Sequence, residues 1–66
     1  MKTLAELLIM TADELAAYYR TFAPQANQLD ALFGREVVTE QLLTIESLYA
    51  DAIGTSYPAA YQQLAA

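Results

Sequence analysis

The sequence contains no cysteine and no histidine. Without cysteine no disulfide can stabilise the fold, and without either residue type we expect no zinc site. The usual nucleophile and the usual general base of enzymes are thereby missing as well. We therefore expect a protein that is not an enzyme and that binds no metal or cofactor. The missing cysteine also fits a reducing compartment.

Basic residues are nearly as scarce. Three lysines and arginines stand against eight acids, which gives a formal net charge of −5. Nucleic acids and anionic membranes bind through lysine and arginine, so we expect direct contact with neither, whereas a basic protein partner would suit this charge. No apolar run approaches the length of a membrane span. Glu6 interrupts the apolar start of the chain, so we expect no signal peptide.

The chain is short but apolar, with 66 residues of which 56% are hydrophobic. This composition argues against disorder. A chain of this size forms a single domain, residues 1–66, and buries only roughly 60% of its unfolded surface. Some apolar surface is therefore expected to face a partner or a second copy.

Helix signals fill the sequence, and no segment has the pattern of a strand. Thr3 with Glu6 and Thr11 with Glu14 form two capping boxes, which predict helices over Leu4–Ile9 and Ala12–Phe22. One continuous helix is the alternative, because no glycine or proline separates the two. The second helix is amphipathic, with an apolar face made of Ala12, Leu15, Ala16, Tyr18, Tyr19 and Phe22.

Proline and glycine divide the rest of the chain. Pro24 should turn Ala23 away from helical angles, and a short helix is predicted over residues 25–33. The longest helix is predicted from Arg35 or Glu36 to Ile53, with Gly54 as its left-handed cap. A last short helix is predicted to start within residues 55–58, with Pro58 in its first turn, and to end at about Leu64. The core stripe of the longest helix is expected to contain Val38, Leu42, Ile45, Tyr49 and Ala52.

These elements predict an all-α fold, a small compact helical bundle of two longer helices and two to three short ones. The second helix should pack antiparallel on the longest helix.

The longest helix carries Glu36, Glu40 and Asp51 on the side opposite its core stripe, with Glu46 at the border and no lysine. Two interpretations remain open. The acids either keep the protein soluble or form a surface complementary to a basic partner. A paired-carboxylate or metal site at Glu36 and Glu40 is disfavoured, because the chain is small and lacks the histidines of helical di-metal sites. These acids would also repel phosphates, which excludes a DNA-recognition helix.

Leu43 falls in the acidic arc and Gln41 in the apolar arc. We expect the short helices to bury Leu43; the alternative is an apolar anchor within a charged rim. Of the five tyrosines, Tyr57 and Tyr61 are expected to be the most exposed, because their helix is short and terminal. Tyrosine is a common hot-spot residue of interfaces.

The tiny single domain, the net charge of −5 and the acids Glu36, Glu40, Glu46 and Asp51 along one helix together give a recognisable profile. It resembles that of small phage-encoded inhibitors, the anti-CRISPR and anti-restriction proteins. The resemblance implies a protein of the bacterial cytoplasm that occupies a nucleic-acid-binding surface on a host defence complex.

The leading hypothesis is therefore a non-enzymatic acidic protein that binds and inhibits a basic protein or ribonucleoprotein complex. Its candidate protein-binding residues are Glu36, Glu40, Leu43, Asp51, Tyr57 and Tyr61. The alternative is a self-associating structural or adaptor module, in which Tyr57, Tyr61 and Leu64 close a homodimer.

Overall fold

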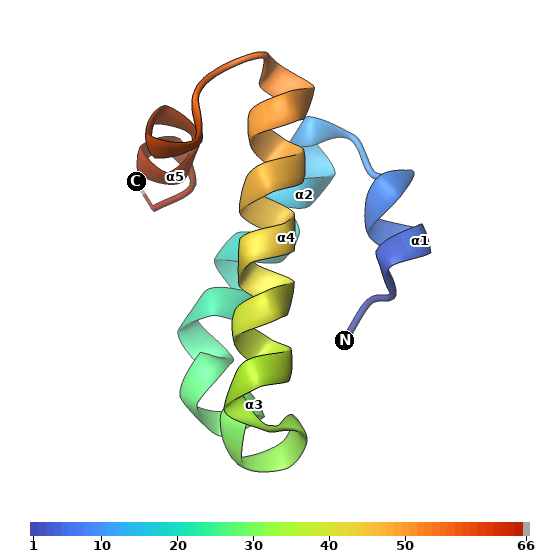
Figure 1. The fold of residues 1–66 in the computed structure, drawn as a ribbon, viewed down its shortest axis with the longest axis vertical. Coiled ribbons are helices and arrows are strands. Elements are labelled where there is room, and N and C mark those ends of the chain that lie inside the picture. The colour runs from blue at the N-terminus through green and yellow to red at the C-terminus, as the bar shows by residue number, and fades with distance from the viewer. Residues whose placement is uncertain (66) are drawn as a thin grey trace.

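A computed structural model describes residues 1–65 and contains no strand in that range. Five α-helices and one 3₁₀ turn follow one another (Figure 1): α1 Leu4–Leu8, α2 Ala12–Phe22, η1 Ala23–Gln25, α3 Ala26–Phe33, α4 Arg35–Ile53 and α5 Tyr57–Ala65. The predicted all-α bundle of two longer and two to three short helices is confirmed, with three short ones among the described residues. None of these helices is long and apolar enough to cross a membrane.

Both capping boxes form, and they explain why α1 and α2 are separate helices. The Thr11 hydroxyl accepts from the Glu14 backbone N–H at 3.2 Å, and the Glu14 carboxylate accepts from the Thr11 N–H at 2.9 Å. Thr3 and Glu6 repeat the arrangement at the start of α1. Each box satisfies N–H groups that the first turn leaves without partners. The alternative of one continuous helix is therefore wrong.

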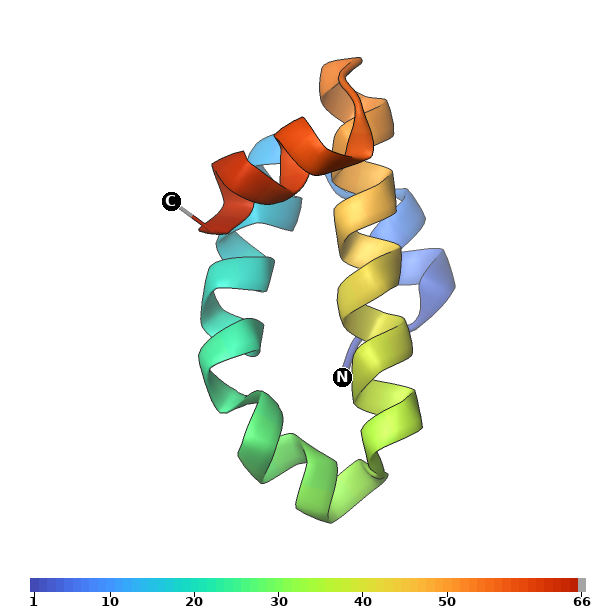
Figure 2. The same ribbon diagram turned by 60° about the vertical axis from the view of Figure 1, so that its left-hand side comes forward.

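The junction of α2 and α3 differs from the prediction. Ala23 keeps helical angles, φ −58° and ψ −42°, although a proline follows it. The steric preference of a residue before proline is a bias rather than a prohibition, and Pro24 fits the first turn of the 3₁₀ segment. The chain therefore bends without leaving the helical region. In Figure 2, α2, η1 and α3 form one arch that stands beside α4.

Two glycines set the limits of α4. Gly34 separates α3 from α4 with φ 93° and ψ 143°, and Gly54 ends α4 in the left-handed conformation with φ 69° and ψ 39°. The Gly54 N–H donates to the carbonyls of Ala50 and Asp51. The predicted left-handed cap at Gly54 is confirmed. Glycine occupies both positions because it adopts both of these conformations without strain.

The core lies between α4, α2 and α5, and α1 adds Leu7 to it. Val38, Ile45 and Tyr49 are buried as expected, and α4 runs in the direction opposite to α2 (Figure 2). Ala52 is exposed, so its place in the core stripe was wrongly predicted. Ala50 is buried instead, because α5 packs on that side of α4.

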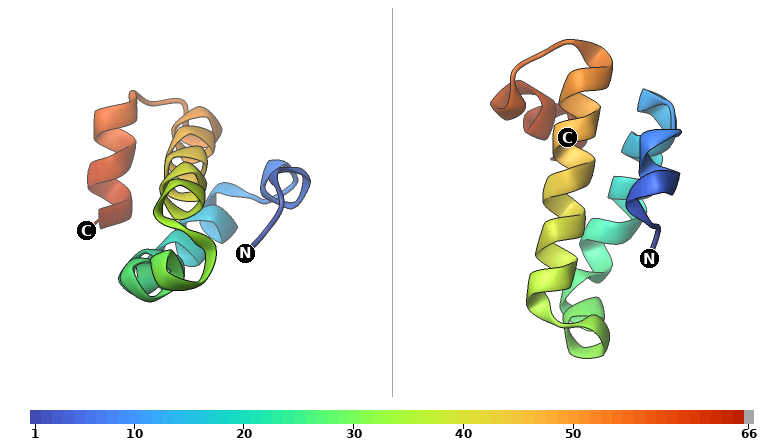
Figure 3. Two further views of the ribbon diagram at one scale, coloured as in Figure 1. Left: turned by 60° about the horizontal axis from the view of Figure 1, so that its bottom comes forward. Right: turned by 45° about the vertical axis from the view of Figure 1, so that its right-hand side comes forward.

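The short helices leave one side of α4 uncovered. Figures 1 and 3 show α1 and α5 on opposite sides of α4, with α2 and α3 behind it. This arrangement presents the outer side of α4 to solvent along its length.

Candidate functional site

The uncovered side of α4 carries an acidic surface. We call it the acidic face, and it consists of Glu36, Glu40, Leu43, Ser47 and Asp51, all exposed. Steps of three or four residues align these side chains along one helix. The shallow hollow over this surface is lined by residues of α4 alone, among them Thr39 and Thr44. The surface is therefore an open face and not a cleft between elements. Such a surface suits contact with a macromolecule better than enclosure of a small molecule.

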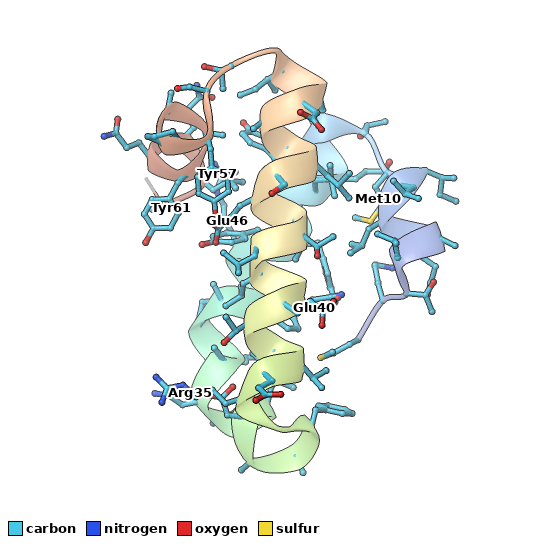
Figure 4. The ribbon with its side chains drawn as sticks, viewed as in Figure 1. Met10, Arg35, Glu40, Glu46, Tyr57 and Tyr61 are labelled. Carbon is cyan, nitrogen blue, oxygen red and sulfur yellow. The ribbon has the colours of Figure 1, made fainter. Side chains whose placement is uncertain are left out.

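Positive charge lies in the acidic face's own helix only as Arg35, which precedes Glu36 at the beginning of the face. Figure 4 shows Arg35 projecting on one side of α4 and Glu40 lying on the other. The Arg20 guanidinium is engaged elsewhere and donates to the Gln63 carbonyl at 3.1 Å. The Lys2 ammonium lies 5.6 Å from the centre of the Tyr18 ring. The carboxylates of the acidic face therefore remain available to an external cation.

Leu43 does not become buried as expected. It is 50% exposed, because α5 and α1 pack on the two flanks of α4 and neither reaches across its outer side. The expected burial is therefore wrong, and the alternative position among the carboxylates is the observed one. A half-exposed leucine inside a charged rim has the composition of a small interface centre.

Glu46 does not belong to the acidic face, although the sequence placed it at the border. It is only 6% exposed and points between α2 and α5. Its carboxylate accepts a hydrogen bond from the Tyr19 hydroxyl at 3.1 Å and another from the Tyr57 hydroxyl. One carboxylate thus links three helices. A helical wheel could not show this, because it does not say which neighbours bring hydroxyl groups to the border of the face.

The two tyrosines respond to this buried carboxylate. Burial, together with the negative charge of Glu46, raises the pKa of Tyr19 to about 12. The hydrogen bond to Glu46, with some burial, raises the pKa of Tyr57 to about 12. Both hydroxyls therefore stay protonated, and able to donate to Glu46, up to a higher pH than an ordinary tyrosine.

Tyr57 and Tyr61 lie on α5, along the flank of α4 that carries Glu46 (Figure 4). They are 40% and 47% exposed, as the sequence predicted. The Tyr57 hydroxyl is fixed by Glu46, so that ring has a defined orientation. Leu64, by contrast, is buried and is not available for the dimer surface in which the sequence had placed it.

The described residues contain no group of three or more acids close enough to hold a metal ion. Comparisons with protein-family models, with curated proteins and with solved structures found no match. A function has therefore to be argued from the geometry and charge of the acidic face and of α5.

Proposed function

We propose that this chain is a non-enzymatic protein that binds a larger, basic protein or ribonucleoprotein complex through the acidic face and inhibits it. The observation that carries the proposal is the exposed row of Glu36, Glu40 and Asp51 around the half-exposed Leu43. An exposed helix that served only solubility would commonly mix both charges along its surface.

Charge complementarity supplies the recognition. A partner patch of lysine and arginine would be attracted over distances of about a Debye length, and the contact would be set by Leu43 and the tyrosine rings. Tyr57 and Tyr61 extend the contact from α4 onto α5. The fixed ring of Tyr57 would lose little conformational freedom on binding, which favours affinity.

Inhibition follows from the kind of partner that such a surface selects. Basic patches on bacterial proteins are often nucleic-acid-binding surfaces, whose affinity rests on phosphate contacts. A protein with a net charge of −5 that covers such a patch would compete with nucleic acid. This is the action of the anti-CRISPR and anti-restriction inhibitors that the chain resembles in profile, and it implies a place in the bacterial cytoplasm.

A pull-down from a bacterial lysate with the tagged chain, washed at low and at high salt, tests the proposal. Screening shortens from about 8 Å at physiological ionic strength to about 3 Å at 1 M salt. We expect a basic protein or complex to be retained at low salt and released at high salt. Addition of nucleic acid to the captured complex should also release it. Retention that is indifferent to both would contradict the proposal.

A second candidate is a self-associating structural or adaptor module. It is favoured by apolar side chains exposed outside the acidic face, namely Leu4 and Leu8 of α1, Ile9 directly after it, and Leu32 of α3. Ile9 is 84% exposed, so a second copy packed on this segment would cover it. Light scattering separates the two candidates, because a concentration-independent monomer excludes self-association.

A further inference from the structure

A strip of large apolar side chains lies exposed on the flank of α4 opposite α5. We call it the amino-terminal strip, and it consists of Met1, Leu4, Leu8, Ile9 and Val37, which are between 45% and 84% exposed. Leu4 and Leu8 stand one turn apart on α1, and Ile9 follows directly. Met1, Leu4 and Val37 line one hollow, which joins α1 to α4 in a continuous surface.

No element among residues 1–65 covers this strip. Figure 3 shows α1 on the outside of the molecule, in front of α2 and beside α4. Leu7 is the one buried residue of α1, so the rest of this helix faces outwards. The exposed parts of the strip amount to about three whole side chains. That is roughly 300–600 Å², the size of the largest apolar patch on a typical monomer, and such patches are often functional.

The amino-terminal strip is nearly neutral, unlike the acidic face. Residues 1–10 contain one basic side chain, Lys2, and one acidic side chain, Glu6. The remaining two bases and seven acids, and with them the whole net charge of −5, belong to residues 11–66. At the edge of the strip, Glu40 lines the same hollow as Met1, whose terminal amine offsets the carboxylate. Two copies can therefore meet here without the repulsion that two acidic faces would cause.

We propose that the amino-terminal strip pairs with the same strip of a second copy of this chain. A neutral apolar strip is complementary to itself about a two-fold axis, whereas a basic partner is attracted to the acidic face instead. Two strips with their polar rims would bury roughly 1,000 Å² in total, which is near the lower limit of a specific interface. We therefore expect a weak dimer, with a Kd of roughly 10 µM to 1 mM.

This inference rests on the self-association that is the second candidate function, and it names the surface that would carry it. Such a pair would leave the acidic face open, because α1 stands on a flank of α4 and not across its outer side (Figure 1). Self-association and binding of a basic partner are thus compatible. The dimer would carry two acidic faces, and a partner that engages both would be held more tightly through effective concentration.

Sedimentation velocity at low and at high salt, over about 10 µM to 1 mM protein, tests the pairing. We expect the mass to rise from that of a monomer towards that of a dimer. High salt should strengthen the association, because it screens the repulsion between two copies of charge −5 and leaves the apolar contact intact. A monomer at every concentration would overturn the proposal. Association that high salt weakens would also overturn it, since charges and not the strip would then hold the copies together.

Two matched variants locate the contact. Leu8→Gln and Leu32→Gln both change an exposed leucine of a short helix, 60% and 75% exposed, without changing charge or much helix propensity. We expect Leu8→Gln to weaken the dimer by about tenfold or more, because two-fold symmetry removes two leucines from one interface. Leu32→Gln should change the Kd by less than about twofold. Equal effects of the two variants would overturn the assignment to the strip.

Leu4→Gln keeps the test decisive if circular dichroism shows that Leu8→Gln loosens α1. Leu4 belongs to the same strip and is 59% exposed, so its replacement should weaken the dimer as well. An unchanged dimer in both strip variants would overturn the proposal.

The leading function fails separately, because the salt-dependent pull-down tests the acidic face whatever the oligomeric state. A dimer that Leu8→Gln weakens, together with no captured basic partner, would support the strip and overturn the leading function alone. If the chain stays monomeric and Leu8→Gln instead releases a captured partner, the strip belongs to that partner and the pairing is wrong.

Discussion

Replacing Tyr19 with phenylalanine removes one of the two hydroxyl donors to the carboxylate of Glu46, a residue that is only 6% exposed. Tyr19 itself is only 7% exposed, so water cannot easily take the place of its hydroxyl. Hydrogen bonds to charged groups contribute about 1.5–3 kcal/mol each. We expect the variant to lower the free energy of unfolding by about 2 kcal/mol. A domain of this size has a total stability of about 3–10 kcal/mol, so the loss is large.

The assay is urea unfolding followed by far-UV circular dichroism, with thermal unfolding in parallel. For a domain of this length, a loss of about 2 kcal/mol corresponds to a fall in Tm of about 8–16 °C. Tyr61→Phe is the matched control, because Tyr61 is 47% exposed and its hydroxyl has no hydrogen-bond partner within residues 1–65. Tyr57→Phe should fall between the two, since Tyr57 is 40% exposed and water can partly replace its hydroxyl. If Tyr19→Phe were no more destabilising than Tyr61→Phe, the carboxylate would not be held as described.

Alkaline titration gives an independent test of the same cluster. Tyr19 has a pKa of about 12 in the folded chain against an ordinary value of 10.0. A raised pKa means that the folded state holds its proton more tightly, so this stabilisation is complete below pH 10 and is lost as the pH rises towards 12. Absorbance of the phenolate should show Tyr19 ionising late or together with unfolding. Tyr19→Phe should flatten the decline of stability over this range.

Three further predictions concern the ends of the helices and the buried side chain of Gln41. Gly54→Ala should lower the free energy of unfolding by about 1 kcal/mol, because no atom crowds a Cβ at that position and only the left-handed conformation is disfavoured. Gly34→Ala should lower it more, by about 1–3 kcal/mol, because the φ and ψ of Gly34 lie close to a region that only glycine populates. Urea unfolding of the two variants measures the difference. An asparagine should be tolerated at Gly54 and not at Gly34, and similar losses at both sites would count against this conformational argument. Thr11→Ala should cost about 1 kcal/mol in the same assay through loss of the cap on α2, whereas a loss within error would show that the capping box contributes little. Gln41→Leu should leave stability nearly unchanged, because it removes one hydrogen bond and one unpaired buried oxygen together, and a loss above about 2 kcal/mol would contradict that balance.

Local signals in the sequence predicted the helices well. Capping boxes, Gly54 and the apolar period of α2 each depend on residues within a few positions, and all were found as expected. Ala23 was predicted wrongly, because the bias before proline is weaker than the tendency of the chain to continue helical into α3.

The candidate site was harder to predict, because it depends on where the short helices pack. Leu43 and Glu46 are only three residues apart on α4, yet one is half exposed and the other buried. The difference arises from α5, which covers the Glu46 flank and brings Tyr57 to the carboxylate. Periodicity gives the angle of each residue around α4, but the direction from which α5 approaches is a tertiary property. The same limit applies to Gln41, since its hydrogen bond to the Lys2 carbonyl spans 39 positions in the sequence.

The most direct test of the central claim compares two triple variants of equal net charge. Glu36→Gln, Glu40→Gln and Asp51→Asn together remove three negative charges from the acidic face, which takes the net charge from −5 to −2. Ala17→Lys, Gln28→Lys and Gln62→Lys reach the same net charge of −2 through three exposed positions outside α4. Both variants are used as bait in the same low-salt pull-down as the unaltered chain. If the acidic face binds the partner, the first variant loses it and the second retains it. Equal retention by both, or equal loss from both, would show that the arrangement of charge on α4 is not what the partner recognises.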